Sequence, residues 1–503
     1  MSPTGASSEL FDVAVIGGGV NGCGVARELQ GRGARVILFE KDDLASHTSS
    51  ASTKLIHGGL RYLEHYEFRL VREALEERER LWAIAPHIIW PLRFVLPLHD
   101  SPRPAWMLRL GLFLYDHIGG RRRLPPTRAL DLTTDPAGRG LAAGTQHGFE
   151  YSDCWVDDAR LVVLNAMDAA ERGATIHTRT AVTGLERASD HWRIEALGAQ
   201  GRTAAQSRIL VNCAGPWVGE MTALAGAQSD HHVRLVRGSH IVIRRRFTHD
   251  RAYIFQGRDR RIVFAIPYEH DFTLIGTTDA DHQGSPDHPT ASAAEIDYLL
   301  QAASGYLAEP VKASDIVWSY SGVRPLIDDG SGRPEETTRD YTLELDISGG
   351  APVVTVFGGK ITTYRRLAES VAQALKGLSP AAERRSWSAQ AALPGGDFPI
   401  TGFEALVSEL QAAFAWADPS LMRRLARAYG TRTWRLMQGA AGPSDLGRSF
   451  GAGLTEREVE YLRRNEWAHT ADDILWRRSK LGLRLSATEV QALSAWLEAG
   501  GPG

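Results

Sequence analysis

The sequence predicts an α/β protein with more than one domain, and three features of the chain support this. A short apolar strand at 11–16 runs directly into a glycine-rich turn and a helical pattern. Two later apolar strands, within 207–221 and 351–377, also end on small residues. After 393–397 strand-like runs disappear and helix-start signals recur. A chain of 503 residues is long enough for two or three separate cores.

Composition excludes some classes of partner. The chain is 43% hydrophobic and 23% charged, with a net charge of −3, so nothing in its charge suggests binding to nucleic acid. The three cysteines have neither CxxC spacing nor the density of a disulfide scaffold, as expected in a reducing cytoplasm. The stretch 81–98 is apolar but contains Pro86, Pro91 and Pro97, so we do not expect it to span a membrane. No spacing of metal ligands is found in the sequence, so no metal is expected.

The glycine-rich turn has the spacing of a dinucleotide-binding site. Gly17, Gly19 and Gly22 form G-x-G-x-x-G between a strand and a helix, where backbone N–H groups and the helix N-terminus can bind a pyrophosphate. The second strand, at 35–40, ends on Glu40, which suits adenosine ribose hydroxyls and disfavours the 2′-phosphate of NADP. A tight turn without a ligand is the alternative, and the combination of strand, motif, helix and Glu40 argues against it.

Later junctions indicate FAD rather than NAD. A strand-rich insert at 173–187 and a strand that ends on Ala214–Gly215 interrupt the simpler NAD-type arrangement. At the third junction Gly358–Gly359 end a strand, and Thr362 or Thr363 can cap the next helix, whose N-terminus would stabilise a reduced flavin. For this junction alone, an ordinary capped helix is the alternative.

Segments spread over most of the chain share the pattern of one family: VIGGGVNGCGVA, SSASTKLIHGGLRYLEHYEFRLVREAL, RPAWMLRLGLFLYDHIG, GFEYSDCWVDDARLV, RLVRGSHIVI, IVWSYSGVRPL, TRDYTL and FGGKITTYR. With these segments the sequence resembles the FAD-dependent, respiratory glycerol-3-phosphate dehydrogenases. The resemblance implies an α/β fold with an FAD-binding two-dinucleotide Rossmann-like domain, a mixed α+β substrate (cap) domain and a C-terminal all-helical domain. The oxidoreductase region would span 9–390, with cap segments at about 87–147 and 230–320, and the helical domain would span 391–503.

The resemblance also implies that FAD is the cofactor and that residues 49–70 wrap the flavin. From Tyr66 onward this segment becomes a helix, with an apolar face that includes Leu70 and Leu81 and a charged face that we expect to be solvated. The expected cofactor-binding residues are Gly17, Gly19, Asn21, Gly22, Glu40, Ser49, Ser52, Lys54, His57, Gly58, Gly59, Val182, Ala214, Gly215, Gly359, Lys360, Ile361 and Thr362.

Oxidation of a secondary alcohol on a flavin requires a base, an aligned C–H bond and a grip on the far end of the substrate. The expected catalytic residues are His240, Arg61 and Arg324, with His240 as the base because a neutral imidazole titrates in the right range. A histidine that serves only in the core is the alternative. The expected substrate-binding residues, several of them cations suited to a phosphate, are Arg61, Tyr62, His240, Arg324, Arg339 and Lys360.

The implied reaction is oxidation of sn-glycerol 3-phosphate to dihydroxyacetone phosphate, with electrons passed to membrane quinone. The alternatives are an oxidase of the same substrate that reduces oxygen, an amine or 2-hydroxy acid oxidase, and a flavin-binding scaffold without turnover. The resemblance further implies a cytoplasmic homodimer, peripheral on the cytoplasmic face of the inner membrane.

Two helical regions carry further expectations. Residues 103–126 predict a helix that is apolar almost all round and is followed by Arg121–Arg123. It would lie in a core or an oligomer interface, or on an anionic membrane surface with the arginines on headgroups. In the C-terminal region, Thr455 and Ser486 have capping-box spacing. The basic cluster Arg477, Arg478 and Lys480 is expected to be a solvated helix face.

Overall fold

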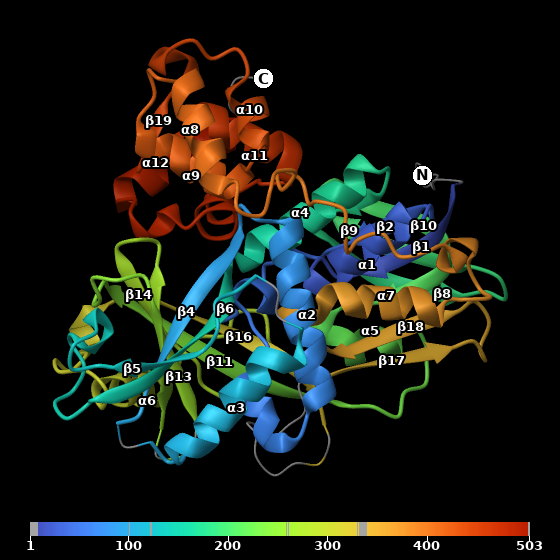
Figure 1. The fold of residues 1–503 in the computed structure, drawn as a ribbon. Coiled ribbons are helices and arrows are strands. Elements are labelled where there is room, and N and C mark those ends of the chain that lie inside the picture. The colour runs from blue at the N-terminus through green and yellow to red at the C-terminus, as the bar shows by residue number, and fades with distance from the viewer. Residues whose placement is uncertain are drawn as a thin grey trace.

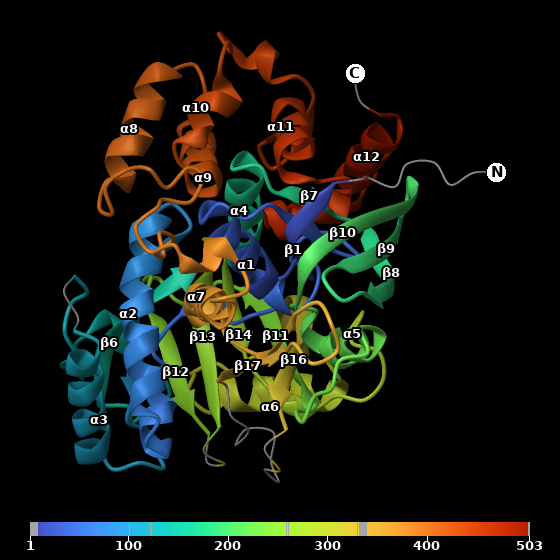
Figure 2. The same ribbon diagram turned by 90° about the vertical axis from the view of Figure 1, so that its right-hand side faces the viewer.

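The chain folds into two large sheets and a helical C-terminal region (Figures 1 and 2). The computed structural model describes residues 9–99, 101–120, 123–257, 259, 261–328, 330 and 340–500, and of Arg61, Glu64 and His65 only the backbone. In both views the C-terminal helices, coloured orange to red, gather at one end of the molecule, above the two sheets.

The first sheet has the strand order β17-β18-β10-β1-β2-β7, and β8 and β9 extend it through β10. Strand β1 pairs in parallel with β10 on one side and with β2 on the other. The central strands of this first sheet are short runs of buried apolar residues, as a sheet covered on both faces requires. The strands are β1 (Leu10–Ile16), β2 (Val36–Phe39), β7 (Thr175–His177), β8 (Thr180–Arg187), β9 (Trp192–Gly198), β10 (Gly201–Asn212), β17 (Tyr341–Asp346) and β18 (Val353–Gly358).

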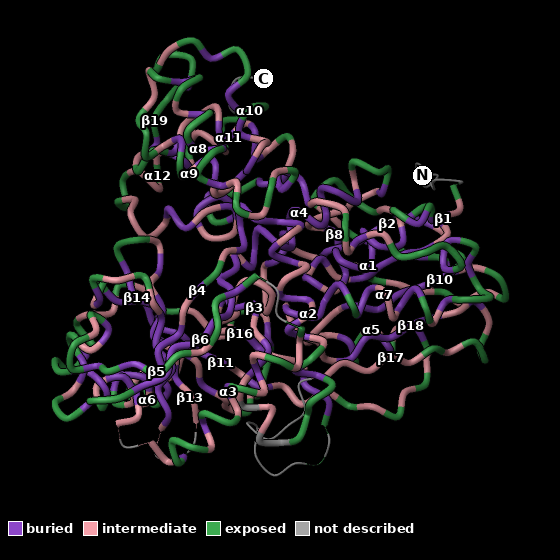
Figure 3. The backbone as a smooth tube through the Cα atoms, in the orientation of Figure 1, coloured by how far each residue is buried: buried purple, intermediate pink, exposed green. Residues whose placement is uncertain are grey.

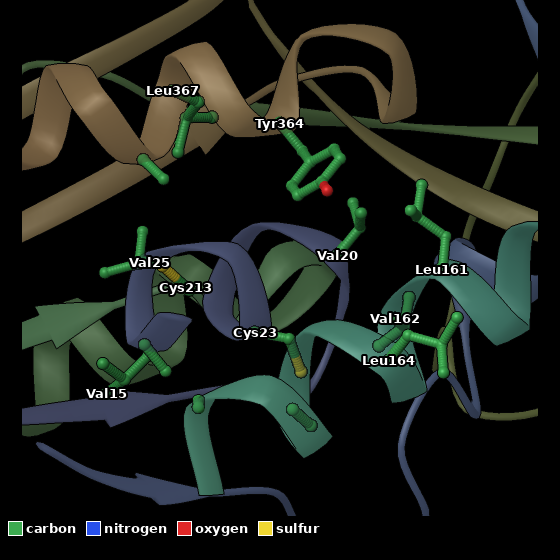
Figure 4. Close-up of a cluster of buried hydrophobic side chains, with 14 of the residues drawn as sticks. Val15, Val20, Cys23, Val25, Leu161, Val162, Leu164, Cys213, Tyr364 and Leu367 are labelled. Atoms are coloured by element: carbon green, nitrogen blue, oxygen red, sulfur yellow. The ribbon is translucent and has the colours of Figure 1, made fainter. Parts of the chain in front are cut away.

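Three helices cover one face of this sheet: α1 (Val20–Gly31), α4 (Asp158–Glu171) and α7 (Tyr364–Ala374). In Figure 4, Cys23 of α1 and Leu161 of α4 belong to the same buried cluster as Tyr364 and Leu367 of α7. On the opposite face, strands β8 and β9 and the short helix α5 (Val218–Leu224) pack through a separate apolar cluster that contains the fully buried Trp192. Both faces are therefore closed, and the strand ends are left for the site.

The second sheet is mostly antiparallel and is covered by α2 (Phe68–Ile84) and α3 (Ala105–Ile118) on one side and by α6 (Ala293–Ser304) on the other. It has the order β15-β11-β14-β13-β12-β4-β6-β3, with β16 on β11 and β5 on β6. Its strands are β3 (Leu55–Ile56), β4 (Ile89–Pro97), β5 (Arg128–Asp131), β6 (His147–Val156), β11 (Val233–Arg244), β12 (Ala252–Gln256), β13 (Ile262–Tyr268), β14 (Phe272–Gly276), β15 (Ala280–Asp281) and β16 (Ile316–Ile327).

The apolar stretch 81–98 is divided between the end of α2 and strand β4. No helix in the described part of the chain is both long and apolar enough to cross a membrane. Helix α2 buries the predicted apolar face, including Leu70 and Leu81. The expectation that its charges are all solvated is wrong for Glu77 and Arg78, which are buried and form ion pairs with Arg365 and Asp153 respectively.

The C-terminal region has its own apolar core and five α-helices among its described residues. It also contains a small hairpin, β19 (Ser449–Gly451) and β20 (Leu454–Thr455), which the expectation of an all-helical domain did not include. The helices are α8 (Phe403–Ala413), α9 (Pro419–Tyr429), α10 (Arg432–Met437), α11 (Glu456–Glu466) and α12 (Ala487–Glu498).

Of the two predicted capping boxes in this region, one forms. Ser486 caps α12, and its hydroxyl accepts from the Glu489 N–H at 3.3 Å while the Glu489 carboxylate accepts from the Ser486 N–H at 2.8 Å. Thr455 makes no side-chain cap on α11, and the Glu458 carboxylate, the other half of the expected box, is bound by Arg424 and the Tyr429 hydroxyl.

The C-terminal region docks on the first sheet through buried charges. In Figure 3 buried segments continue across this junction, while exposed ones lie mostly at the periphery. The expectation of a solvated basic face is wrong: Arg478 is fully buried and Lys480 is 5% exposed, because both lie against the rest of the chain. Arg160 of α4 and Glu466 of α11, both fully buried, form a further ion pair across the junction.

Candidate active site

A cavity of about 370 Å³ opens where the parallel strands of the first sheet end. Residues that follow β1, β10 and β18 line it, together with the segment 45–62 and part of β16. Ligands of open α/β sheets bind at this position, outside the carboxyl ends of the strands. The predicted residues in its wall are Gly17, Gly19, Asn21, Glu40, Ser49, Ser52, His57, Tyr62, Val182, Ala214, Gly215, Arg324, Gly359, Lys360, Ile361 and Thr362.

The turn between β1 and α1 forms one end of the cavity. Gly17 has a φ of +111°, and a Cβ there would lie 2.4 Å from the Cys213 carbonyl oxygen. Gly22 does not line the cavity; a Cβ on it would lie 1.9 Å from the Gly17 oxygen, so this glycine lets α1 pack against the turn. The Asn21 amide donates to the Gly358 oxygen at 3.2 Å, and its buried Oδ1 accepts from none of the described residues.

Glu40 closes the cavity at the end of β2. Its carboxylate accepts from the Gly18 N–H at 2.5 Å and from the Asp42 N–H at 2.8 Å. Burial raises the pKa of Glu40, and these two hydrogen bonds oppose that rise. The carboxylate is thus fixed at the position expected for a ribose partner.

Sequence reasoning missed the part of the wall near Glu40 that contains Lys41, His47 and Trp217. The Lys41 ammonium lies 4.2 Å from the Trp217 ring centroid, and the His47 ring meets Trp217 edge-on. His47 Nε2 lies 2.8 Å from Asp42 Oδ2, a contact that holds the pKa of Asp42 well below its usual range. Lys41 directly follows the acid after β2, and Trp217 follows the small residues after β10. These positions are the sequence signal that could have identified them.

The segment 49–62 lies along the cavity, but not all of its predicted residues face it. Lys54, which was expected to bind the cofactor, does not line the cavity, because its ammonium is 1% exposed and binds both Asp158 oxygens at 2.8 and 2.9 Å. A buried ammonium requires such a partner. Gly58 and Gly59 are also outside the wall, and the Gly58 N–H donates to the Tyr115 hydroxyl of α3 at 2.7 Å.

Lys360 and His57 meet at the turn after β18. The Lys360 ammonium lies 3.7 Å from the Tyr62 ring centroid. Burial, followed by the charges of Lys360 and Arg78, lowers the pKa of His57 to about 4, so its ring is neutral at pH 7. The expected threonine cap of α7 is wrong: Thr363 makes no side-chain cap, and the Thr362 hydroxyl contacts the His57 backbone nitrogen at 3.3 Å.

Arg324 reaches the cavity from β16. Its guanidinium donates to the Thr277 hydroxyl at 2.8 Å and to the Thr278 carbonyl at 3.3 Å, and it forms an ion pair with Asp279. The fork is therefore oriented by a loop at the end of β14. Arg339 lies outside the described residues, and the side chain of Arg61 is likewise not described.

His240 is fully buried on β11 and does not line the cavity. Its Nε2 lies 3.0 Å from the Thr53 hydroxyl, and its ring stacks on Tyr320 with centroids 4.8 Å apart. Burial, with help from Arg324 and Lys54, lowers its pKa well below the usual value. The structure therefore places a neutral imidazole behind the cavity wall, in contact with Thr53.

These residues fit FAD. The turn after β1 has no side chain that could occupy the place of a pyrophosphate, and Glu40 is fixed beside it. The buried Asn21 oxygen and the glycines after β18 lie in the same cavity, next to one another. Together the fold and the site define a flavin-dependent oxidoreductase.

Comparison with known proteins agrees with the assignment to the flavin-dependent oxidoreductases. Residues 12–365 match the model of the FAD dependent oxidoreductase family, and residues 386–499 match the C-terminal domain of alpha-glycerophosphate oxidase. The chain is 51% identical to D-erythritol 1-phosphate dehydrogenase of Brucella abortus, covering 98% of this chain and 99% of the relative. It is also 51% identical to glycerol-3-phosphate dehydrogenase of Pseudomonas aeruginosa, covering 100% and 98%.

Among solved structures, the glycerol-3-phosphate dehydrogenase of Bacillus halodurans complexed with FAD superposes with a TM-score of 0.78 at 26% identity, covering 98% of this chain and 90% of that one. The chain belongs to the FAD-dependent oxidoreductases and, within them, to the family of the FAD-dependent glycerol-3-phosphate dehydrogenases. Its cofactor is FAD.

Proposed function

We propose that the protein oxidises sn-glycerol 3-phosphate to dihydroxyacetone phosphate and passes the electrons to membrane quinone. The observation that carries this proposal is the presence of two cations, Arg324 and Lys360, in the wall of the FAD cavity. A substrate with a phosphate at one end and an oxidisable hydroxyl at the other needs such a grip beside the cofactor. The Pseudomonas aeruginosa relative, named for this activity, supports the assignment.

The grip on the phosphate comes first in the mechanism. Arg324 presents a planar fork that Thr277 and Asp279 hold in place, and the dianion would compete with Asp279 for it. Lys360 adds a second positive charge, held against the Tyr62 ring. Once both engage the phosphate, the carbinol end of the substrate is restricted to a few orientations.

Removal of the hydroxyl proton is assigned to His240. Its neutral imidazole can accept a proton, and the Thr53 hydroxyl at 3.0 Å provides a contact through which the proton would arrive. His57, neutral and in the cavity wall, is the competing base. FAD, when bound, supplies the acceptor for the hydride from the substrate carbon.

Anaerobic bleaching of the flavin tests this assignment. Full-length protein with FAD should lose its flavin absorbance on mixing with glycerol 3-phosphate and should respond poorly to glycerol, which lacks the phosphate. Equal rates with the two compounds would contradict the phosphate grip, and no bleaching with either would favour a scaffold without turnover.

D-erythritol 1-phosphate is a second candidate substrate, because the Brucella abortus relative named for it is as similar to this chain as the Pseudomonas aeruginosa one. Both substrates carry the phosphate that Arg324 and Lys360 would hold. The ratio of kcat/KM for the two compounds in the same bleaching assay decides between them. A ratio that favours the longer substrate would replace glycerol 3-phosphate in the proposal.

The acceptor is proposed to be quinone, with oxygen as the alternative. The match of residues 386–499 to an oxidase domain keeps that alternative open. Turnover with a soluble quinone under argon, compared with turnover in air without quinone, separates the two. A dehydrogenase should be faster with quinone by an order of magnitude or more.

Helix α3 supports a peripheral position on the cytoplasmic face of the inner membrane. Its inner face is buried through Leu108, Leu112 and Tyr115, while its outer face exposes Trp106, Leu110 and Phe113 by 69%, 52% and 57%. In Figure 2 this helix lies at the edge of the molecule, beside α2. Apolar and aromatic side chains on one exposed helix face suit the lipid boundary.

We also propose that the protein is a homodimer, for which the same outer face of α3 is the candidate interface. Arg121 and Arg122 of the expected headgroup triplet lie outside the described residues. The two uses of the helix differ in what they require: lipid binding needs vesicles, and a dimer forms without them.

A further inference from the structure

The clearest unassigned feature is a turn of the C-terminal region that reaches the cofactor cavity from outside. The π-helical turn Asp473–Arg478 lies between α11 and α12 and packs against the first sheet and α4. Residues 40–46, here called the ribose loop, follow β2, and four of them, Glu40, Lys41, Ala45 and Ser46, line the FAD cavity. The two segments are joined by buried ion pairs.

Asp43 is the centre of this contact. It is 1% exposed and does not line the cavity, so its carboxylate points away from FAD. Arg478 binds both of its oxygens, at 2.5 and 2.7 Å, and Arg477 binds one of them at 2.6 Å. In the folded protein the Asp43 carboxylate therefore contacts two guanidinium groups in place of solvent, and both belong to residues more than 430 positions away in the sequence.

A second connection runs through Arg179. Its guanidinium donates to both oxygens of Asp473 at 2.8 Å, and its backbone N–H donates to the Asp42 carbonyl at 2.7 Å. Asp473 also binds Arg477 and accepts from the N–H groups of His469 and Thr470, which lower the pKa of Asp473 against the effect of burial. The ribose loop is thus held at two consecutive residues, Asp42 and Asp43.

On its inner side the loop is tied to the dinucleotide turn. The Ala45 N–H donates to the Gly18 oxygen at 3.2 Å, and the Gly18 N–H donates to Glu40. The loop has little regular structure of its own, and Ala45 adopts a positive φ of 61°. Its conformation therefore depends on contacts with neighbouring segments.

We propose that Arg477, Arg478 and Asp473 are positioning residues for FAD: the C-terminal region orders the ribose loop in advance and so tightens binding of the adenosine half of the cofactor. This inference depends on the FAD site and not on the identity of the substrate. Without these contacts, FAD would have to order the loop as it binds. The conformational entropy of even one or two residues then weakens binding about tenfold or more.

The test is FAD affinity of the full-length protein, measured by titrating FAD into protein stripped of flavin and following flavin fluorescence. Arg478→Gln should raise the Kd for FAD about tenfold or more and should speed hydrogen exchange of residues 40–48 in the flavin-free protein. The double variant Asp43→Asn with Arg478→Gln should bind FAD no worse than Arg478→Gln alone, because the buried carboxylate, which Arg478→Gln leaves with Arg477 as its remaining guanidinium partner, is then replaced by a neutral amide.

The matched control is Arg424→Gln. It removes a cation from the nearly buried Glu458 within the same C-terminal region but touches no residue of the ribose loop. It should lower the melting temperature and leave the Kd for FAD unchanged. Equal weakening of FAD by Arg424→Gln and Arg478→Gln would overturn the proposal, because general destabilisation would then explain both.

Two more outcomes are decisive. An unchanged Kd in a folded Arg478→Gln protein, measured well below its melting temperature, contradicts the proposal. Should that variant fail to fold, Arg477→Gln removes one of the contacts on Asp43 and is milder, since Arg477 is 17% exposed. A Kd raised a few-fold by it supports the proposal, and an unchanged Kd contradicts it.

Discussion

Arg324 reaches the cavity from strand β16 and Lys360 from the turn after β18, and each is held by a different kind of contact. Arg324 is oriented by hydroxyl, carbonyl and carboxylate partners at the end of β14, whereas Lys360 lies over an aromatic ring. A guanidinium in such a frame is restricted to one plane, and an ammonium over a ring retains rotational freedom. We therefore expect Arg324 to set the geometry of the phosphate and Lys360 to add charge.

Replacing Arg324 with lysine separates charge from shape. Arg324→Lys keeps the positive charge but loses the fork, so kcat/KM for glycerol 3-phosphate should fall by about 10- to 100-fold. Steady-state kinetics with a soluble acceptor provide the measurement. The slow reaction with glycerol, which makes no use of the grip, should hardly change. Wild-type kcat/KM in the variant would show that the phosphate binds elsewhere.

The proposed base can be tested against its competitor. His240→Ala should retain FAD, reduce its flavin about 10²- to 10⁴-fold more slowly, and lose the acid limb of the pH profile. Because burial lowers the pKa of His240, that limb should lie below pH 6.5 in the wild type. Anaerobic stopped-flow mixing measures both quantities.

His57→Ala and Thr53→Val complete this comparison. Thr53→Val removes the hydroxyl next to His240 and should also slow flavin reduction, though less than His240→Ala. A near-normal rate in His240→Ala together with a large loss in His57→Ala would transfer the role of base to His57, which lies in the cavity wall.

Helix N-termini and helix faces connect the cavity to the rest of the fold. The first turn of α6 holds Glu295, whose carboxylate accepts from Arg237 at 3.0 Å, from the Ser239 hydroxyl at 2.9 Å and from the Thr278 hydroxyl at 2.8 Å. Thr278 is next to both Thr277 and Asp279, the partners of Arg324. Helix α6 thus supports Arg324, the proposed phosphate ligand, without lining the cavity.

Glu295→Gln should destabilise the fold in a pH-dependent way. Burial alone would raise the pKa of Glu295, but Arg237 and the other donors lower it from 4.5 to about 2. A carboxyl group with a lowered folded pKa stabilises the fold above its unfolded pKa and loses that contribution as the pH falls from about 4.5 to 2. We expect a loss of about 2 kcal/mol in the free energy of unfolding at pH 7, less than the full shift because solvent screens part of it.

Urea unfolding at pH 7 and pH 3 measures this effect. The difference between the variant and wild type should shrink at pH 3, because the Glu295 carboxyl of the unfolded wild-type chain is then protonated and must lose that proton when the chain folds. Asp297→Asn, an exposed acid on the same helix, is the control and should change nothing at either pH. A difference that stays constant with pH would mean that the ion pair with Arg237 contributes little.

Helix α3 makes a prediction about the membrane. Replacing Trp106 and Phe113 with serine should reduce co-flotation with anionic vesicles several-fold while leaving anaerobic flavin reduction unchanged, because only the outer face of the helix is altered. Ile347→Ser, at a residue that is 58% exposed just after β17, is the matched control. Binding should weaken with salt, and replacing Arg121, Arg122 and Arg123 with serine should reduce it as well.

Unchanged flotation of the Trp106 and Phe113 variant would place the membrane contact elsewhere. If the same variant changed from dimer to monomer in light scattering without vesicles, the outer face of α3 would be the interface between two copies of the chain.

For the whole molecule, the junction with the C-terminal region is the distinctive feature. It is closed by charges and not by an apolar surface alone: Arg160 with Glu466, and Arg477 and Arg478 with Asp43. A buried pair contributes little net stability compared with apolar packing, but the loss of one partner is costly. The two regions should therefore respond to single substitutions as one unit.

Glu466→Gln tests this coupling. It leaves Arg160 buried without its carboxylate and should cost roughly 3 kcal/mol in the free energy of unfolding. Chemical denaturation gives the value, and limited proteolysis should show earlier cleavage between the oxidoreductase and C-terminal regions. Glu460→Gln, at a partly exposed position of the same helix, should have almost no effect. An equal response of the two variants would show that the buried pair does not hold the junction.

Local sequence was sufficient to predict those features of the fold and the site that depend only on neighbouring residues. The glycine spacing of 17–22, the acid that ends β2 and the small residues after β10 and β18 are fixed by what the backbone must do at each turn. Except for Gly22, which lets α1 pack against the first turn, they line one cavity. The apolar face of α2 and the Ser486 cap follow from helical periodicity and from a hydrogen bond over three residues.

Tertiary structure alone decided where the charged residues lie. From the sequence, Lys54 looks like a cation of a polar loop and Arg478 like a cation of a solvated helix. Each is buried against a carboxylate, Asp158 or Asp43, that is far away in the sequence. His240 and Thr53 meet across two distant segments in the same way. The energy of a buried charge depends on which partner the fold brings to it, and no local pattern encodes that partner.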